Sequence, residues 1–92
     1  MQKTDFIKAV AVRANQSQKE TKEIIDAAIE VITEALQRRE RVVLTGFGTF
    51  EVRQRQARKG VHPQTRSKIL IPATRVPGFS ASSTLKNAVK DS

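Results

Sequence analysis

The chain has 92 residues, which suits one small domain, and chains of this size often rely on a second subunit because they bury a modest fraction of their surface. It has no cysteine and one histidine, so disulfides and cysteine-ligated zinc are excluded, and we expect no catalytic triad, metal or cofactor. The longest apolar run, Ala9 to Val12, is too short for a membrane span, and the N-terminus lacks the apolar segment of a secretory signal. We therefore expect a cytoplasmic protein.

The net charge of +8 is concentrated in the second half of the chain. Residues 1–40 hold seven basic and seven acidic side chains, whereas residues 41–92 hold ten basic and two acidic ones. Seven of these ten cations lie between Arg53 and Arg75, where no acid occurs. Because a surface that only keeps a protein soluble usually mixes both signs, the acid-free run predicts a polyanionic partner.

The first predicted helix extends to about Ala14. Thr4 is its expected N-cap, and Phe6, Val10 and Ala14 share one face at i, i+4 and i+8, with Ala9 beside them.

The second predicted helix begins at Ser17 and runs to about Arg38. Ser17 and Glu20 have the spacing of a capping box, in which each side chain bonds the other residue's amide. The helix carries two adjacent apolar stripes, one of Ile25, Ile29, Ile32 and Leu36 and one of Ile24, Ala28, Val31 and Ala35. So wide a face exceeds what one short neighbouring helix could cover, and it predicts a helical dimer interface.

From residue 41 the apolar period changes from 3.6 to 2. Residues 42–45 predict a strand, 46–48 a glycine turn, and the alternation at Phe50 and Val52 a second strand. Residues 53–59 continue the alternation without any large apolar side chain, so we expect a basic hairpin that leaves the core, with its tip at 60–65 and a return strand at 67–71.

Two further features concern the end of the chain. Pro72 and Pro77 suit edge or terminal positions of strands, where a missing amide donor costs nothing. Residues 80–83 offer N-caps for a short last helix, with Leu85, Ala88 and Val89 on its expected buried side. The sequence thus predicts one α+β domain with a helical body at 1–40, a small antiparallel sheet with a basic arm (about 53–75) within 41–79, and a closing helix within 80–92.

The segment from Gly46 to Arg53, GFGTFEVR, the cations that follow it and the return segment from Ile69 to Phe79, ILIPATRVPGF, closely resemble the bacterial HU/IHF family of histone-like, DNA-bending proteins. The resemblance covers essentially the whole chain. It implies an intertwined homodimer whose helices form the body and whose two β-arms enter the minor groove of a duplex. Serines stand at Ser80 and Ser83, where the family often has lysine.

The resemblance also implies roles for individual residues. Pro63 would be the wedge inserted between base pairs at each arm tip, and Lys3 and Lys86 would meet the outer flanks of a bent duplex. The residues expected to bind DNA are Lys3, Arg53, Arg55, Arg58, Lys59, Gly60, Val61, His62, Pro63, Gln64, Thr65, Arg66, Lys68, Arg75 and Lys86. The residues expected at the dimer interface are Ile25, Ile29, Ile32, Leu36, Phe47, Phe50 and Phe79.

The expected function is binding and bending of double-stranded DNA with little sequence specificity, in the bacterial nucleoid and without catalysis. Kinked, nicked or gapped DNA should bind better because part of the distortion is already made. The first alternative is a sequence-specific bending protein of the IHF kind. A basic RNA- or ribosome-associated protein is a second alternative, but it is disfavoured because the arm carries no aromatic side chain on which bases could stack. No membrane or small-molecule partner is expected.

Overall fold

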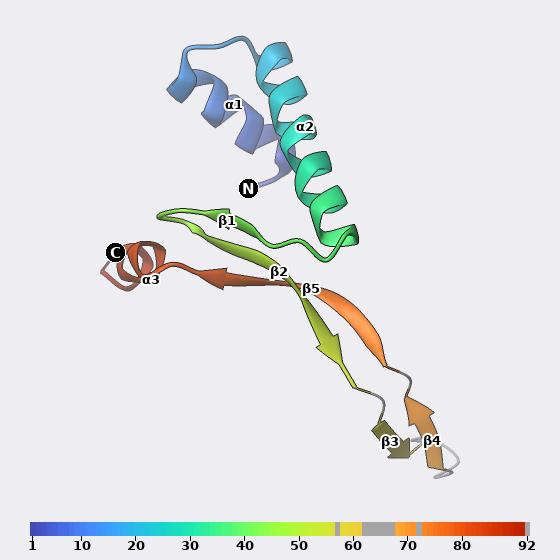
Figure 1. The fold of residues 1–92 in the computed structure, drawn as a ribbon. Coiled ribbons are helices and arrows are strands. Elements are labelled where there is room, and N and C mark those ends of the chain that lie inside the picture. The colour runs from blue at the N-terminus through green and yellow to red at the C-terminus, as the bar shows by residue number, and fades with distance from the viewer. Residues whose placement is uncertain (57, 62–67, 72, 92) are drawn as a thin grey trace. The chain divides into compact units, whose positions relative to one another are not determined.

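The computed structural model describes residues 1–56, 58–61, 68–71 and 73–91, with side chains described for 1–56 and 73–91. Its elements are α1 (Lys3–Ala14), α2 (Gln18–Gln37), β1 (Val42–Leu44), β2 (Gly48–Arg55), β3 (Arg58–Val61), β4 (Lys68–Ile71), β5 (Thr74–Ala81) and α3 (Ser83–Lys90) (Figure 1). The α+β class is thereby confirmed. The chain groups into two compact units, Met1–Glu34 and Ala35–Ser92.

Helix α1 begins one residue before the predicted cap. Its N-cap is Gln2, whose backbone amide donates to the Asp5 carboxylate at 3.3 Å. The prediction that Thr4 caps this helix is wrong, because the acid at the third helical position bonds the amide of Gln2 and so starts the first turn there. The predicted end is confirmed, since Asn15 takes the left-handed conformation (φ 55°) that closes the helix.

The buried residues of α1 are not those of the apolar face named from the sequence. Ile7 and Ala11 are buried and Val10 is half-buried, whereas Phe6 is 47% exposed and Ala14 is exposed. The face of Ile7 and Ala11 is shifted by one residue from the face of Phe6, Val10 and Ala14. Both have the i, i+4 spacing, so periodicity alone did not distinguish them.

Helix α2 starts as predicted, because the Ser17 hydroxyl accepts a hydrogen bond from the Glu20 amide at 3.0 Å. Of its predicted apolar face, Ala35 is buried and Ile25, Ile32 and Leu36 are half-buried. The remaining members are exposed in the single chain: Ile24, Ala28, Ile29 and Val31. Much of this apolar face is therefore left uncovered by the chain's own residues.

Three antiparallel strands form the main sheet, in the order β1-β2-β5 (Figure 1). The predicted glycine turn joins β1 to β2, with Gly46 at φ 86° and the Phe47 amide donating to the Leu44 carbonyl at 2.9 Å. Pro77 lies opposite Val52 in β5, which is an edge strand of this sheet. The prediction of an edge position for Pro77 is confirmed, because β5 pairs with another strand of this sheet on one side only.

A second antiparallel ladder joins β3 to β4, with Gly60 opposite Ile69 and Val61 opposite Lys68. Placing Gly60 and Val61 in the hairpin tip was therefore wrong, since both extend the strand ladder. The rest of the predicted tip, residues 62–65, lies outside the described residues, as do Arg66 and Pro72.

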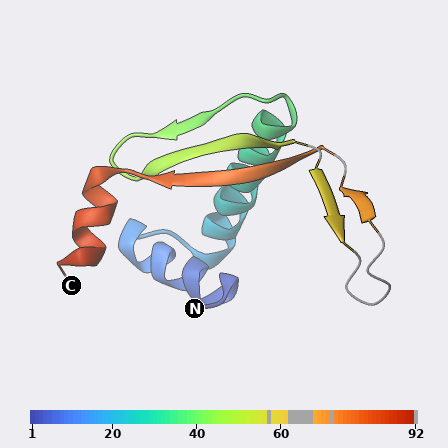
Figure 2. The same ribbon diagram turned by 90° about the horizontal axis from the view of Figure 1, so that it is seen from below.

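Helix α3 is capped within the predicted serines. The Ser82 hydroxyl accepts from the Leu85 amide at 3.2 Å. Its predicted buried side is wrong for the single chain, because Leu85 is half-buried while Ala88 and Val89 are exposed. Helix α3 follows one end of β5, at Ala81, and the β3–β4 ladder adjoins the opposite end (Figure 2). Over the described part of the chain, no helix combines the length and the apolar character needed to cross a bilayer.

Candidate nucleic-acid interface

The two strands β2 and β5 form a ribbon with two chemically different faces. Glu51 pairs with Gly78, Arg53 with Val76 and Arg55 with Thr74. Since side chains alternate along a strand and directly opposed residues share a side, these pairs lie on one face of the ribbon. We call this the polar face, which carries Thr49, Glu51, Arg53, Arg55, Thr74, Val76, Gly78 and Ser80. The opposite, apolar face carries Phe50, Val52, Pro77 and Phe79.

The apolar face contains an aromatic cluster. The ring centroid of Phe79 lies 4.9 Å from that of Phe50 and 5.3 Å from that of Phe47. Gly48 makes room for Phe79, because a Cβ at this position would lie 2.6 Å from a ring carbon and from the Ser80 carbonyl oxygen. Phe47 and Phe79 nevertheless remain 46% and 39% exposed in the single chain. The cluster is thus an apolar surface as well as a packing centre.

The three arm cations with described side chains lie on the same ribbon. Arg53 and Arg55 share the polar face, two residues apart on β2. Arg75 pairs with Gln54 and so lies on the other side. All three are exposed. The structure therefore places these predicted site residues together, but presents their charges from both sides of the ribbon.

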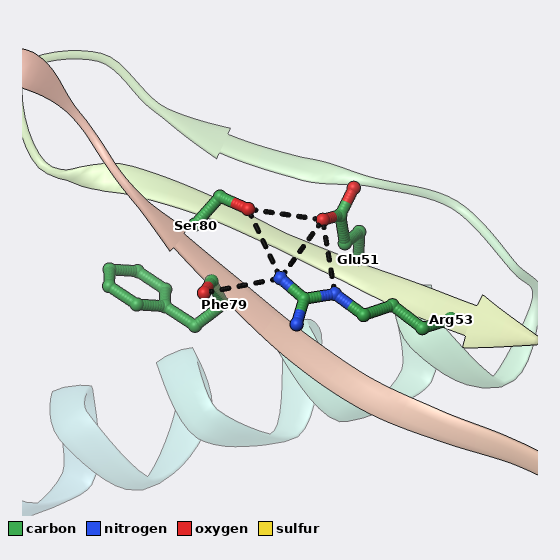
Figure 3. A network of polar contacts seen from close by, with 4 residues as sticks. All are labelled: Glu51, Arg53, Phe79 and Ser80. Carbon is green, nitrogen blue, oxygen red and sulfur yellow. Dashed lines mark hydrogen bonds and ion pairs between the residues drawn. The ribbon is translucent and has the colours of Figure 1, made fainter.

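Arg53 makes several contacts at once (Figure 3). Its Nε and Nη2 both donate to Oε1 of Glu51 at 3.4 Å, and Nη2 also donates to the Phe79 carbonyl at 3.4 Å and to the Ser80 hydroxyl at 3.2 Å. The Ser80 hydroxyl in turn donates to Oε1 of Glu51 at 3.1 Å. Glu51 and Ser80 were not predicted as site residues, although Glu51 at two residues before Arg53 was a visible signal.

Lys3, predicted to meet the flank of a bent duplex, is paired with an acid. Its Nζ lies 2.6 Å from Oδ1 of Asp26, and Nζ of Lys22 lies 2.6 Å from Oδ2 of the same carboxylate. The hydrogen bond from Lys22, and then the ion pair with Lys3, hold the pKa of Asp26 below its ordinary value. The hydrogen bond to Asp26 likewise raises the pKa of Lys22. Two cations share one acid, so the cluster keeps a positive charge.

The remaining predicted contacts are placed in part. Lys86 is exposed on α3, and its amide donates to the Ser82 carbonyl at 2.9 Å. For the arm residues Arg58, Lys59 and Lys68 the structure places the backbone in the β3–β4 ladder. His62, Pro63, Gln64, Thr65 and Arg66 lie outside the described residues. Within the described chain, no three acidic or histidine side chains gather closely enough to hold a metal ion.

Comparison with known proteins identifies the family. A family model described as "Bacterial DNA-binding protein" matches residues 1–90. The chain belongs to this family. It is 52% identical over 90 residues to the DNA-binding protein HU of Staphylococcus aureus and 49% identical to that of Geobacillus stearothermophilus, each match covering 98% of this chain and 100% of the relative. The family resemblance read from the sequence is thus confirmed.

Solved structures of the family have the same fold. The HU chain of an Anabaena HU–DNA cocrystal structure matches with a TM-score of 0.91 and 44% identity, covering 97% of each chain. HU from Thermotoga maritima matches with a TM-score of 0.71 and 34% identity, covering 97% of this chain and 98% of that one. Both matches cover nearly the whole length of this chain.

Proposed function

We propose that the chain is a histone-like architectural protein that binds and bends double-stranded DNA with little sequence specificity. The observation that carries the proposal is the two-stranded ribbon, whose cations project from both faces and continue into an acid-free basic arm. The similarity over nearly the whole length to an HU chain solved with DNA supports the same function. The cations would neutralise phosphates and release counterions, which supplies affinity without reading the base sequence.

We also propose that the active form is a homodimer. In the single chain the buried apolar residues among those described are Ile7, Ala11 and Ala35, and no described side chain is less than 2% exposed. The predicted interface residues Ile29, Phe47 and Phe79 are all more than a third exposed. A chain of this size with so little buried apolar surface requires a second copy to be stable. Sedimentation equilibrium at micromolar concentration should therefore give the mass of a dimer, and a folded monomer would contradict this.

The finer parts of the proposal follow from how bending is achieved. Pro63 would act as the wedge at the arm tip, and kinked, nicked or gapped duplexes would bind more tightly because they deform at lower cost. Binding to chromosomal DNA would place the protein in the nucleoid. The role is structural and needs no catalytic step.

A competition experiment tests the proposed function. Labelled intact duplex, bound at one fixed salt concentration, is competed with unlabelled intact duplex of unrelated sequences, nicked duplex and single-stranded RNA. The proposal predicts that the unrelated duplexes compete equally, that nicked duplex competes better and that RNA competes worst. A strong preference for one duplex sequence would favour an IHF-like protein, and the strongest competition by RNA would favour an RNA-associated one.

A further inference from the structure

The Arg53 side chain occupies the space that a side chain at residue 78 would fill. A Cβ built on Gly78 would lie 2.7 Å from both Cδ and Cζ of Arg53, and closer still to its Nε. Gly78 does not have a positive φ, so its backbone conformation does not itself require glycine. What glycine provides here is room for the guanidinium of Arg53 against strand β5.

The partners of Arg53 occupy one edge of its guanidinium. Nε and Nη2 face the carboxylate of Glu51 and the hydroxyl of Ser80, as Figure 3 shows. Nη1 makes no hydrogen bond or ion pair to any residue within the described part of the chain. The Arg53 side chain is 52% exposed and that of Glu51 is 31% exposed. One edge of the guanidinium is thus held by the protein, and the other donor group remains available to a ligand.

Glu51 is one of two acids in residues 41–92, and its position in the basic half has two possible meanings. As a charge alone it would weaken the attraction of the arm for DNA. As a hydrogen-bond acceptor it would fix the direction of an otherwise flexible side chain. An arginine that is already ordered loses less rotamer entropy when it binds a phosphate, so fixing its direction favours binding.

We propose that Glu51, Ser80 and Gly78 are positioning residues that hold Arg53 against the polar face and present its Nη1 to a phosphate of the DNA backbone. This inference rests on the proposed function. Three features of the two strands converge on it: the acceptor oxygen of Glu51, the hydroxyl of Ser80 and the missing Cβ of Gly78. It assigns to Glu51 a favourable role that its charge alone would oppose.

The test compares two variants of Glu51 that carry the same charge. Glu51→Gln removes the negative charge but keeps an oxygen acceptor at the same distance from the backbone, whereas Glu51→Ala removes both. Affinity for an intact duplex is measured for the full-length protein over a series of salt concentrations. The pair Glu40→Gln and Glu40→Ala is the matched control, because Glu40 bonds Arg38 at 3.2 Å on the surface and lies outside the ribbon.

If Glu51 positions Arg53, Glu51→Gln binds at least as tightly as the unmodified protein, and Glu51→Ala binds roughly three- to tenfold more weakly than Glu51→Gln. The salt slope of Glu51→Ala should also be smaller in magnitude by about one or two, because each dimer loses up to two phosphate contacts. Gly78→Ala, which displaces the flexible end of Arg53, should resemble Glu51→Ala. The two Glu40 variants should bind alike.

The same comparison in an Arg53→Ala background isolates the effect. There Glu51→Gln and Glu51→Ala should bind with equal affinity, since no guanidinium is left to position. Equal affinities with Arg53 present, or an undiminished difference without it, would overturn the inference while leaving the proposed function intact. Failure of the unmodified protein to bind duplex DNA would overturn both. Matching melting temperatures would show that the differences do not arise from unfolding.

Discussion

Replacing Phe79 by alanine should destabilise the fold, because this ring joins the two other aromatic side chains of the apolar face. Phe79 is 39% exposed, so about three fifths of the side chain is buried in the single chain. At about 25 cal/mol per Å² of apolar surface, truncation to alanine should cost about 2 kcal/mol. Loss of the ring pairs at 4.9 and 5.3 Å should add about 1 kcal/mol each. We expect a total loss of about 4 kcal/mol.

Urea unfolding followed by circular dichroism measures this loss. Both proteins are compared at one protein concentration, because the stability of a dimer depends on concentration. Val43→Ala is the control, since Val43 is a β-branched residue of the same sheet that is 59% exposed and should lose less than about 1 kcal/mol. A loss below about 1 kcal/mol for Phe79→Ala would refute the view that the aromatic cluster stabilises the sheet.

Two further predictions concern the helical unit and the arm tip. The lowered pKa of Asp26 implies stability that is present above the ordinary pKa of aspartate and is lost as the pH falls through the lower folded-state value. Asp26→Asn should therefore be less stable than the unmodified protein at pH 7, and the difference in stability should shrink below about pH 4. Urea unfolding midpoints that differ by the same amount at pH 7 and in acid would contradict this. Pro63→Ala should keep most of its affinity for straight duplex and lose bending, because the arm cations are unchanged. Fluorescence transfer between duplex ends measures the bend, and an unchanged end-to-end distance would remove Pro63 from the mechanism.

Local signals predicted the order and the limits of most elements. The Ser17 cap, the glycine turn at Gly46 and the edge position of Pro77 each depend on a few neighbouring residues, and each is confirmed. The Thr4 cap failed because a competing acid, Asp5, lies one residue further along. A local signal therefore fixes the start of a helix only where no neighbouring residue offers a competing capping hydrogen bond.

Burial was harder to predict, because it depends on what covers each face. Ile7 and Phe6 have equivalent periodic partners in α1, but only Ile7 is buried. Exposure of Ala88 in α3 and of Ile29 in α2 shows that an apolar stripe does not reveal whether its own chain covers it. For this reason the sequence revealed which residues share an apolar face, but not which of them the single chain buries.

The candidate site likewise has some features that could be predicted from the sequence and others that could not. The acid-free run of cations was visible in the sequence, as was the strand alternation that places Arg53 beside Arg55. The contacts of Arg53 with Ser80 and its passage across Gly78 depend on the register between β2 and β5. Residues separated by more than twenty positions have no local signal that links them, so this network required the structure.

The central claim is that the basic ribbon and arm bind duplex DNA by neutralising phosphates, and the salt dependence of binding tests it most directly. If each dimer covers about six to ten phosphates, log affinity should fall with log salt at a slope of roughly −5 to −9. Replacing Arg55 and Arg58 by alanine should flatten that slope and weaken binding to unrelated duplexes alike. A slope near zero, or a slope unchanged by these substitutions, would contradict the account.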